Sequence, residues 1–281
     1  MLYVPGSNDF RLQISSHGGS RPASGFGSTI TPAQNAYGSY VALISGASVT
    51  EDCFGILINI NSIAVSAQNK AALVTIGRDP SGGTTYSDWL THLNGACASP
   101  YNVGSGGVWF YFPMYIKAGT SLAAKASVNN STVGTARVNV VLFGQPRRPA
   151  NIRVATKFFS FGENTTTSTG SLVTPGTVAE GSWTALGSTT TYPLWWWQIG
   201  YSCNDSTMSA AAIHADLSYG SSFQSIIENQ VICTTTTEQI NNSPLTAGCV
   251  ANVASGEQIY GRLQSSTTAD SQVAMIAYGC G

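Results

Sequence analysis

Few residues of this sequence could take part in acid–base or metal chemistry. Three histidines occur in 281 residues, and Asp, Glu, Lys and Arg together make up 9%. His214 and Asp216 stand two positions apart, so on a strand they would share one face and could hydrogen-bond each other. No nucleophile and no third ligand accompanies them. We interpret them as a structural or solvent-facing pair rather than as a catalytic or metal-binding pair.

Paired carboxylates would indicate a glycoside hydrolase. The candidate pairs are Glu51 with Asp52, Asp79 with Asp88, and Glu228 with Glu238. None of these pairs recurs elsewhere in the chain, and surface loops commonly carry such residues. The sequence also has no P-loop, dinucleotide-binding, EF-hand or nucleophile-elbow motif. We therefore predict that the chain is not an enzyme and has no catalytic residue, cofactor or metal site.

Aromatic residues are the more informative set. Trp109 and Tyr111 lie in one apolar segment, and Trp195, Trp196 and Trp197 follow one another in a second. Because side chains alternate across a strand, we expect Trp195 and Trp197 on the core face and Trp196 on the opposite face. Exposed aromatic rings often mark an interface or a sugar-stacking surface. For Trp196, three alternatives stay open: a subunit contact, packing under a loop or neighbouring domain, and a glycan platform.

Trp196, Trp109 and Tyr111 are accordingly the candidate interface or glycan-binding residues.

A series of short segments occurs twice in the chain, in the same order and at a spacing that shrinks steadily, as expected if loops of the second copy are shorter. The matched residues are Thr31-Pro32 with Thr174-Pro175, Gly38-Ser39-Tyr40 with Gly181-Ser182-Trp183, Ala71-Ala72-Leu73 with Ala211-Ala212-Ile213, Gly119 with Gly256, and Gly144 with Gly279. This alignment places His214 at the position of Val74. We infer a tandem duplication of one domain.

The fold class follows from the pattern inside each copy. Short segments of alternating apolar and polar residues are separated by Gly, Ser and Thr turns, without a convincing helical period. This pattern predicts an all-β protein of two tandem jelly-roll-like antiparallel β-sandwich domains. We expect an extended N-terminal arm over 1–27, a first domain over 28–146, a connecting segment over 147–170 and a second domain over 171–281. Two alternatives stay open for the arm: it becomes ordered only against a neighbour, or it is a loosely attached terminus.

Composition excludes several classes of partner. The net charge is −1, and the twelve Lys and Arg residues are scattered, so we predict no nucleic-acid binding. No apolar run approaches the roughly 18 residues that a membrane span requires, so we predict no membrane insertion. The six cysteines form no C-x-x-C motif, and we expect mostly buried, reduced thiols. A disulfide within the second copy stays open as an alternative.

Both copies resemble a known family. The shared order is Thr-Pro, Gly-Ser-[Tyr/Trp], an aromatic strand with Phe-Pro, Ile-x-Ala-Gly-x-x-Leu-Ala-Ala-[Lys/Arg], and Val-x-Val-x-Leu-x-Gly. The first copy carries the later motifs at Phe112-Pro113, Ile116–Lys125 and Val138–Gly144, and the second carries the Ala-Gly motif at Val253–Arg262 but lacks Phe-Pro. This order resembles a β-sandwich domain in virion proteins of tailed bacteriophages.

The resemblance implies a structural component on the outside of a tailed-phage virion, either associated with the tail or its fibres or decorating the capsid. It implies assembly with other virion proteins after synthesis in the bacterial host cytoplasm. A homo-oligomer is expected, and a trimer is preferred by analogy with phage spikes. The alternative is a carbohydrate-binding module that recognises host surface glycans, and both roles could coexist in host attachment. An exposed aromatic ring in a polar groove would favour glycan binding, whereas burial of these rings between subunits would favour assembly.

Overall fold

The structure, a computed structural model, describes residues 11–16, 27–64, 72–95, 108–128, 135–144, 153–164, 169–203, 212–233, 248–267 and 273–281. For residues 11–16, 61–64, 203 and 233 it describes the backbone alone. Within these ranges the chain forms strands β1–β20 and one 3-10 turn, η1 (Gly46–Ser48). In this part of the chain, no helix has the length and apolar character needed to cross a membrane. The prediction of an all-β protein is confirmed.

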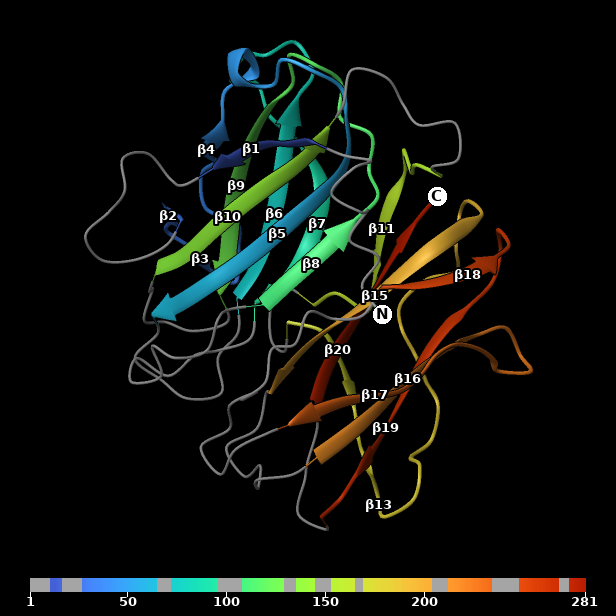
Figure 1. Cartoon of the computed structure of the whole chain (residues 1–281). Coiled ribbons are helices and arrows are strands. Elements are labelled where there is room, and N and C mark those ends of the chain that lie inside the picture. Colours follow the sequence, from blue (N-terminus) through green and yellow to red (C-terminus); the bar gives the residue numbers. More distant parts are fainter. Residues whose placement is uncertain are drawn as a thin grey trace.

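The first domain is a sandwich of two sheets (Figure 1). Sheet 1A has the strand order β1-β10-β5-β8, with β2 also paired to β10. Sheet 1B has the order β3-β9-β6-β7, with β4 also paired to β9. The strands are β1 (Arg11–Ser16), β2 (Ser28–Ile30), β3 (Ala33–Gln34), β4 (Val41–Ile44), β5 (Cys53–Ala64), β6 (Ala72–Asp79), β7 (Ser87–Gly95), β8 (Val108–Phe112), β9 (Ser121–Val128) and β10 (Thr135–Gly144).

The second domain is built in the same way. Sheet 2A has the order β11-β20-β15-β18, with β12 also paired to β20. Sheet 2B has the order β13-β19-β16-β17, with β14 also paired to β19. The strands are β11 (Phe158–Phe161), β12 (Ser171–Val173), β13 (Gly176–Thr177), β14 (Thr184–Ala185), β15 (Leu194–Cys203), β16 (Ala212–Tyr219), β17 (Gln224–Cys233), β18 (Cys249–Val253), β19 (Ile259–Ser265) and β20 (Val273–Cys280).

Strand for strand, the second sandwich repeats the first. The pairing of β10 with β1, β2 and β5 recurs as the pairing of β20 with β11, β12 and β15, so in both sheets the last strand lies beside the first, as in a jelly roll. Unusual backbone angles recur as well: φ is +52° at Asn35 and +58° at Val178, and +58° at His92 and +54° at Asn229. The prediction of two tandem jelly-roll-like antiparallel β-sandwich domains is confirmed.

Two strands fall inside the segments that were expected to flank the domains. Strand β1 belongs to segment 1–27 and pairs with β10, and β11 belongs to segment 147–170 and pairs with β20. Apart from β1 and Gly27, segment 1–27 lies outside the described residues. Each sandwich therefore takes the first strand of one sheet from the segment in front of it.

The buried apolar residues form two clusters, and the first cluster crosses the domain boundary. The second cluster lies between sheets 2A and 2B and includes Trp197, Ile199 and Met275. The first lies between sheets 1A and 1B, but it also contains side chains of the second domain, which are Trp195, Trp196, Ile276, Tyr278 and Cys280. The two sandwiches therefore share a continuous apolar contact, which we call the domain junction.

Val178 is a position where the duplication stores strain. A β-branched residue is rarely found at positive φ, whereas Asn, which stands at the equivalent position 35, tolerates it. Both residues donate the backbone N–H to an equivalent carbonyl, Asn35 to Val128 at 2.8 Å and Val178 to Ser265 at 3.0 Å. We expect Val178→Asn to raise the free energy of unfolding by about 1 kcal/mol in denaturant titrations. The reverse change, Asn35→Val, should lower it by a similar amount, and an effect of the same sign for both would contradict this explanation.

Candidate binding surfaces

The candidate residues Trp196 and Tyr111 meet inside the molecule, at the domain junction. Each is 6% exposed. Their rings pack edge to face with centroids 5.8 Å apart, and the Trp196 indole N–H donates to the Tyr111 carbonyl oxygen at 3.1 Å. Trp109, two residues before Tyr111 on β8, is half-buried. The observed location of Trp196 corresponds to packing under a neighbouring domain of the same chain.

The expected placement of the three tryptophans is wrong at one residue. Trp197 belongs to the second core, as expected, but Trp195 and Trp196 both belong to the first cluster. The physical reason is a bulge: between Leu194 and Trp196, two steps along β15 face three steps along β18, so the extra residue lies in β18 opposite Trp195. A bulge disrupts the local pairing and increases the twist, which changes the direction of the side chains around it. Arg153 covers the Trp195 ring, with its guanidinium carbon 4.5 Å from the ring centroid.

Tyr278 is the centre of the junction. It projects from the outer face of sheet 2A and packs edge to face on Phe110, at 5.3 Å between centroids. Its hydroxyl accepts the Asn94 backbone N–H at 2.7 Å and donates to the His92 carbonyl at 2.9 Å. The Asn94 side chain is fully buried and donates to Ser202 Oγ at 3.1 Å. The open end of the first sandwich, between β7 and β8, is thus closed by the second domain.

His92 links the junction to a group of charges. Its Nδ1 lies 3.1 Å from Ser160 Oγ of the second domain, and its ring packs against Tyr37. Burial lowers the pKa of His92 below its usual 6.5, while Glu163 and Asp88 oppose this effect and Lys125 adds to it. The folded state therefore binds a proton at His92 less readily than the unfolded state does, so that stability is lost as the pH falls below about 6.5.

We expect His92→Asn to remove this pH dependence. Asn accepts the positive φ, as Asn229 shows at the equivalent position of the second domain. Between about pH 7 and 5, the unmodified chain should lose stability by up to about 1.4 kcal/mol per pH unit, and the variant should lose much less. Chemical denaturation at several pH values measures this difference. An unchanged slope in His92→Asn would refute the assignment.

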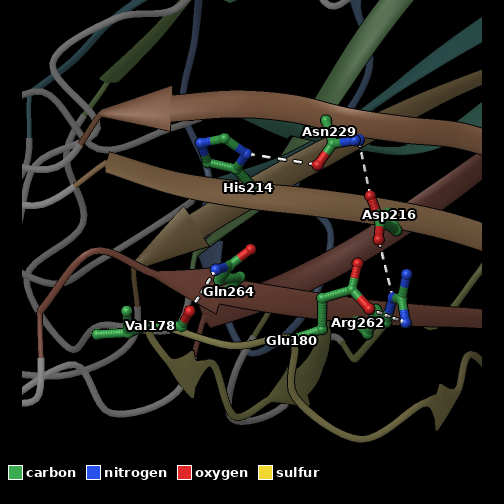
Figure 2. A network of polar contacts seen from close by, with 7 residues as sticks. All are labelled: Val178, Glu180, His214, Asp216, Asn229, Arg262 and Gln264. Carbon is green, nitrogen blue, oxygen red and sulfur yellow. Dashed lines mark hydrogen bonds and ion pairs between the residues drawn. The ribbon is translucent and has the colours of Figure 1, made fainter.

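The outer face of sheet 2B carries a polar network (Figure 2). Asp216 accepts the Asn229 backbone N–H at 2.7 Å and the Arg262 Nε–H at 2.8 Å. Arg262 also forms an ion pair with Glu180. His214 and Asp216 share this face, as expected, but they do not contact each other directly: His214 Nδ1 faces Asn229 Oδ1 at 3.5 Å. Asn229 therefore stands between the two residues.

The first domain has a related cluster at the equivalent place, which explains why both copies keep Gly-Ser-[Tyr/Trp] and a basic residue at position 125 or 262. The Lys125 ammonium lies over the Tyr40 ring at 4.8 Å and pairs with Asp88 at 2.6 Å. In the second domain, the Arg262 guanidinium lies over the Trp183 ring at 4.3 Å. Cation–ring contacts of this kind contribute roughly 0.5–2 kcal/mol each. The repeated motif residues thus fasten the segment before β4 or β14 to the sheet, which is a structural role.

A cavity of about 290 Å³ lies beside the network on sheet 2B. Its walls combine hydrogen-bonding groups with an exposed aliphatic side chain, and they consist of Val178, Ala212, His214, Gln264, Ser265 and Ser266. Gln264 holds one wall in place, since its Nε2 donates to the Val178 carbonyl at 2.9 Å. The cavity could accommodate a small polar group. His214 was singled out in the sequence, but the other wall residues were not, because they come from β16, from the end of β19 and from the residue that follows β13.

The carboxylates considered for hydrolysis hold loops and sheets together. Asp52 accepts the Ala118 N–H at 2.8 Å, and Asp79 accepts the Ser81 and Thr85 N–H groups at 2.9 Å. Asp88 pairs with Lys125. Hydrogen bonds from Ser81 lower the pKa of Asp79 below its usual range. Glu238 lies outside the described residues. Among the residues that the structure describes, no group of three or more His, Cys, Asp or Glu side chains could hold a metal ion.

Cys53, Cys249 and Cys280 are free thiols. Burial raises the pKa of Cys53 to about 12 and that of Cys280 well above its usual value. Such thiols are poor nucleophiles at neutral pH. The side chains of Cys97, Cys203 and Cys233 lie outside the described residues.

Exposed apolar side chains are distributed unevenly. In the part of the chain that the structure describes, all large hydrophobic residues that are exposed belong to the second domain: Leu172, Val178, Tyr192, Phe223, Val231 and Val250. Large apolar side chains that are exposed to water gain stability when another protein covers them. The second domain is therefore the better candidate for a contact surface.

Comparisons with known proteins give distant likenesses. No protein-family model matches the chain, and no curated protein does. A chain of Broad Bean Stain Virus, solved by cryo-EM, is 10% identical with a TM-score of 0.32. The match covers 99% of this chain and 92% of the virus chain. The tandem CBM22-1-CBM22-2 domain of Paenibacillus barcinonensis Xyn10C is 10% identical with a TM-score of 0.30, over 97% of this chain and 98% of the other. The fold described above rests on the strands of this chain itself.

Proposed function

We propose that the chain is a structural component on the outside of a tailed-phage virion, associated with the tail or fibres or decorating the capsid, and that it acts by protein–protein assembly. The motifs shared with phage virion domains suggest the particle. The observation that carries the assembly role is the restriction of exposed apolar side chains to the second domain. The junction adds support, since it fixes two sandwiches as one block that could bridge neighbours.

The surface chemistry suits a protein held in an assembly. Only 9% of the residues are charged and the net charge is −1, so neighbouring copies repel one another weakly. Interfaces of permanent assemblies are large and apolar. The Phe223 and Val231 side chains, exposed by 41% and 47%, stand at a turn and on an edge strand of sheet 2B, where a partner can reach them.

Cryo-electron microscopy of the native particle, with this chain located in the map, tests the proposal. Density on the capsid lattice would identify a decoration protein, and density on the tail would identify a tail or host-attachment component. Absence from every purified particle would overturn the virion proposal.

A second candidate function is glycan recognition, which the cavity on sheet 2B favours. His214, Gln264 and Ser266 offer hydrogen bonds there, and Val178, 72% exposed, offers an apolar wall. Trp196 is too deeply buried to serve as the platform. A glycan array probed with the purified chain tests this function. Binding that is lost in His214→Ala and kept in Trp183→Ala would support the cavity as the site, and the absence of any binding would exclude this function for the tested glycans.

A further inference from the structure

The domain junction provides a template for contact between separate copies of the chain. The end of the first sandwich at β7 and β8 packs on the outer face of sheet 2A. Because the chain is duplicated, each side of the junction has a counterpart that the junction does not use. The counterpart of the β7 edge is the β17 edge of the second domain, and the counterpart of the outer face of sheet 2A is the outer face of sheet 1A. We propose that these two surfaces bind each other between neighbouring copies, which gives a head-to-tail assembly.

Strand pairing identifies the equivalent residues. On the matched strands β9 and β19, Ser127 pairs with Leu73 and Gln264 pairs with His214, so Leu73 and His214 are equivalent. Leu73 pairs in turn with Asn94, and His214 pairs with Val231. Val231 therefore occupies in the second domain the place that Asn94 occupies at the junction. Ile30 and Val173, which directly precede the matched Thr31 and Thr174, pair with Ala136 and Val273. Strand pairing therefore matches Gly144 with Gly281 rather than with Gly279. On this register, Val141 occupies in sheet 1A the place of Tyr278 in sheet 2A, and Phe143 occupies the place of Cys280.

Both members of the contact change together from polar to apolar. At the junction, the Tyr278 hydroxyl accepts the Asn94 backbone N–H, and the buried Asn94 side chain donates to Ser202. On the surfaces left over, Val231 is 47% exposed and Val141, in the place of Tyr278, is half-buried. Phe143, also half-buried, stands in the place of Cys280, which is fully buried at the junction. Because an apolar residue stands on each side, contact between the two surfaces would be stabilised by the removal of apolar area from water.

A second copy is therefore the occupant that these surfaces fit best. The contact would continue an interface that already exists within the chain, between domains of the same origin. It would be heterologous, since different surfaces meet, and such contacts close into rings or grow into filaments. The inference extends the proposed assembly function, but it can be tested on the purified chain alone, so that failure here and absence from the particle are separate results.

The test uses one variant on each side of the contact. We expect the unmodified chain to show concentration-dependent oligomers in sedimentation velocity experiments, and Val231→Asp and Phe143→Asp each to sediment as monomers. An equimolar mixture of the two variants retains one intact surface of each kind, so it should form particles of twice the mass of one chain and no larger. A contact between identical surfaces would not be restored in this way.

Two further variants keep the test decisive. Val141→Lys disrupts the same face without removing the Phe143 ring, which packs on Tyr111, and it serves if Phe143→Asp does not fold. Val178→Asn removes an exposed apolar side chain from the β13 side of sheet 2B, the side opposite to β17, and should assemble normally. A monomeric unmodified chain, a mixture that stays monomeric, or the same loss in Val178→Asn would overturn the proposal.

Discussion

Trp196→Ala should destabilise the chain by about 3–5 kcal/mol, which is the usual cost of removing a buried tryptophan ring. The ring is 6% exposed, packs on Tyr111 and donates a hydrogen bond to its carbonyl. Because it joins the two domains, its loss should also uncouple them, and the second domain should unfold at a different denaturant concentration from the first. Urea titrations followed by circular dichroism and tryptophan fluorescence measure both effects.

Trp183→Ala is the matched control for this substitution. Trp183 is half-buried on sheet 2B and contacts Arg262 and Phe223, so its removal should cost only about 1–2 kcal/mol and should leave the domains coupled. Equal costs for the two variants would show that the junction contributes no more than an ordinary surface contact. A glycan platform at Trp196 would give a third pattern, in which binding falls while stability is unchanged.

Asp216→Ala should destabilise the second domain by about 3 kcal/mol. The Asp216 side chain is 8% exposed, and its removal leaves the Asn229 N–H without its acceptor and Arg262 with one carboxylate instead of two. A buried polar group that loses its hydrogen-bond partner destabilises the folded state by about its desolvation penalty. Removing one member of a buried ion pair lowers the free energy of unfolding by several kcal/mol. The change in the free energy of unfolding is the quantity to measure.

The first domain provides the control for Asp216. There, Thr75 accepts the His92 N–H at the equivalent bulge, at 3.3 Å. Asp216→Thr should keep an acceptor for Asn229 and cost about half as much as the alanine variant. Glu180→Ala removes the exposed partner of Arg262 and should cost less than about 1 kcal/mol. If Asp216→Ala costs no more than Glu180→Ala, the carboxylate is not the centre of the network.

The fold could be predicted because its signals are local. In β10, buried and half-buried residues alternate over Thr135–Gly144, as the sequence pattern indicates. The bulge at Trp195 and the one-residue offset at His214 could not be predicted by counting: strand pairing sets His214 opposite Gln264, which makes it equivalent to Leu73 rather than Val74. Register depends on partners that are distant in the chain.

The junction left one signal in the sequence. All eight residues of β20, Val273–Cys280, are buried, although the matching strand β10 buries only every second residue. A strand covered on both faces lacks alternation. The continuous apolar run Val-Ala-Met-Ile-Ala-Tyr at 273–278 therefore indicated that sheet 2A is covered by a second layer on its outer side. The cavity left no such signal, because its walls come from three separate segments of the chain.

The position of β20 has a consequence for synthesis. The ribosome synthesises β10, the last strand of the first domain, long before it synthesises β20. Sheet 1A can therefore be completed while the second domain is still being made. Tyr278 and the rest of β20 arrive last among the described strands, and they complete both sheet 2A and the seal over β7 and β8. A chain cut short before residue 273 would leave Phe110 and Phe112 uncovered and sheet 2A divided. Unfinished copies would thus be marked by exposed aromatic surface and be accessible to proteases before they could enter an assembly.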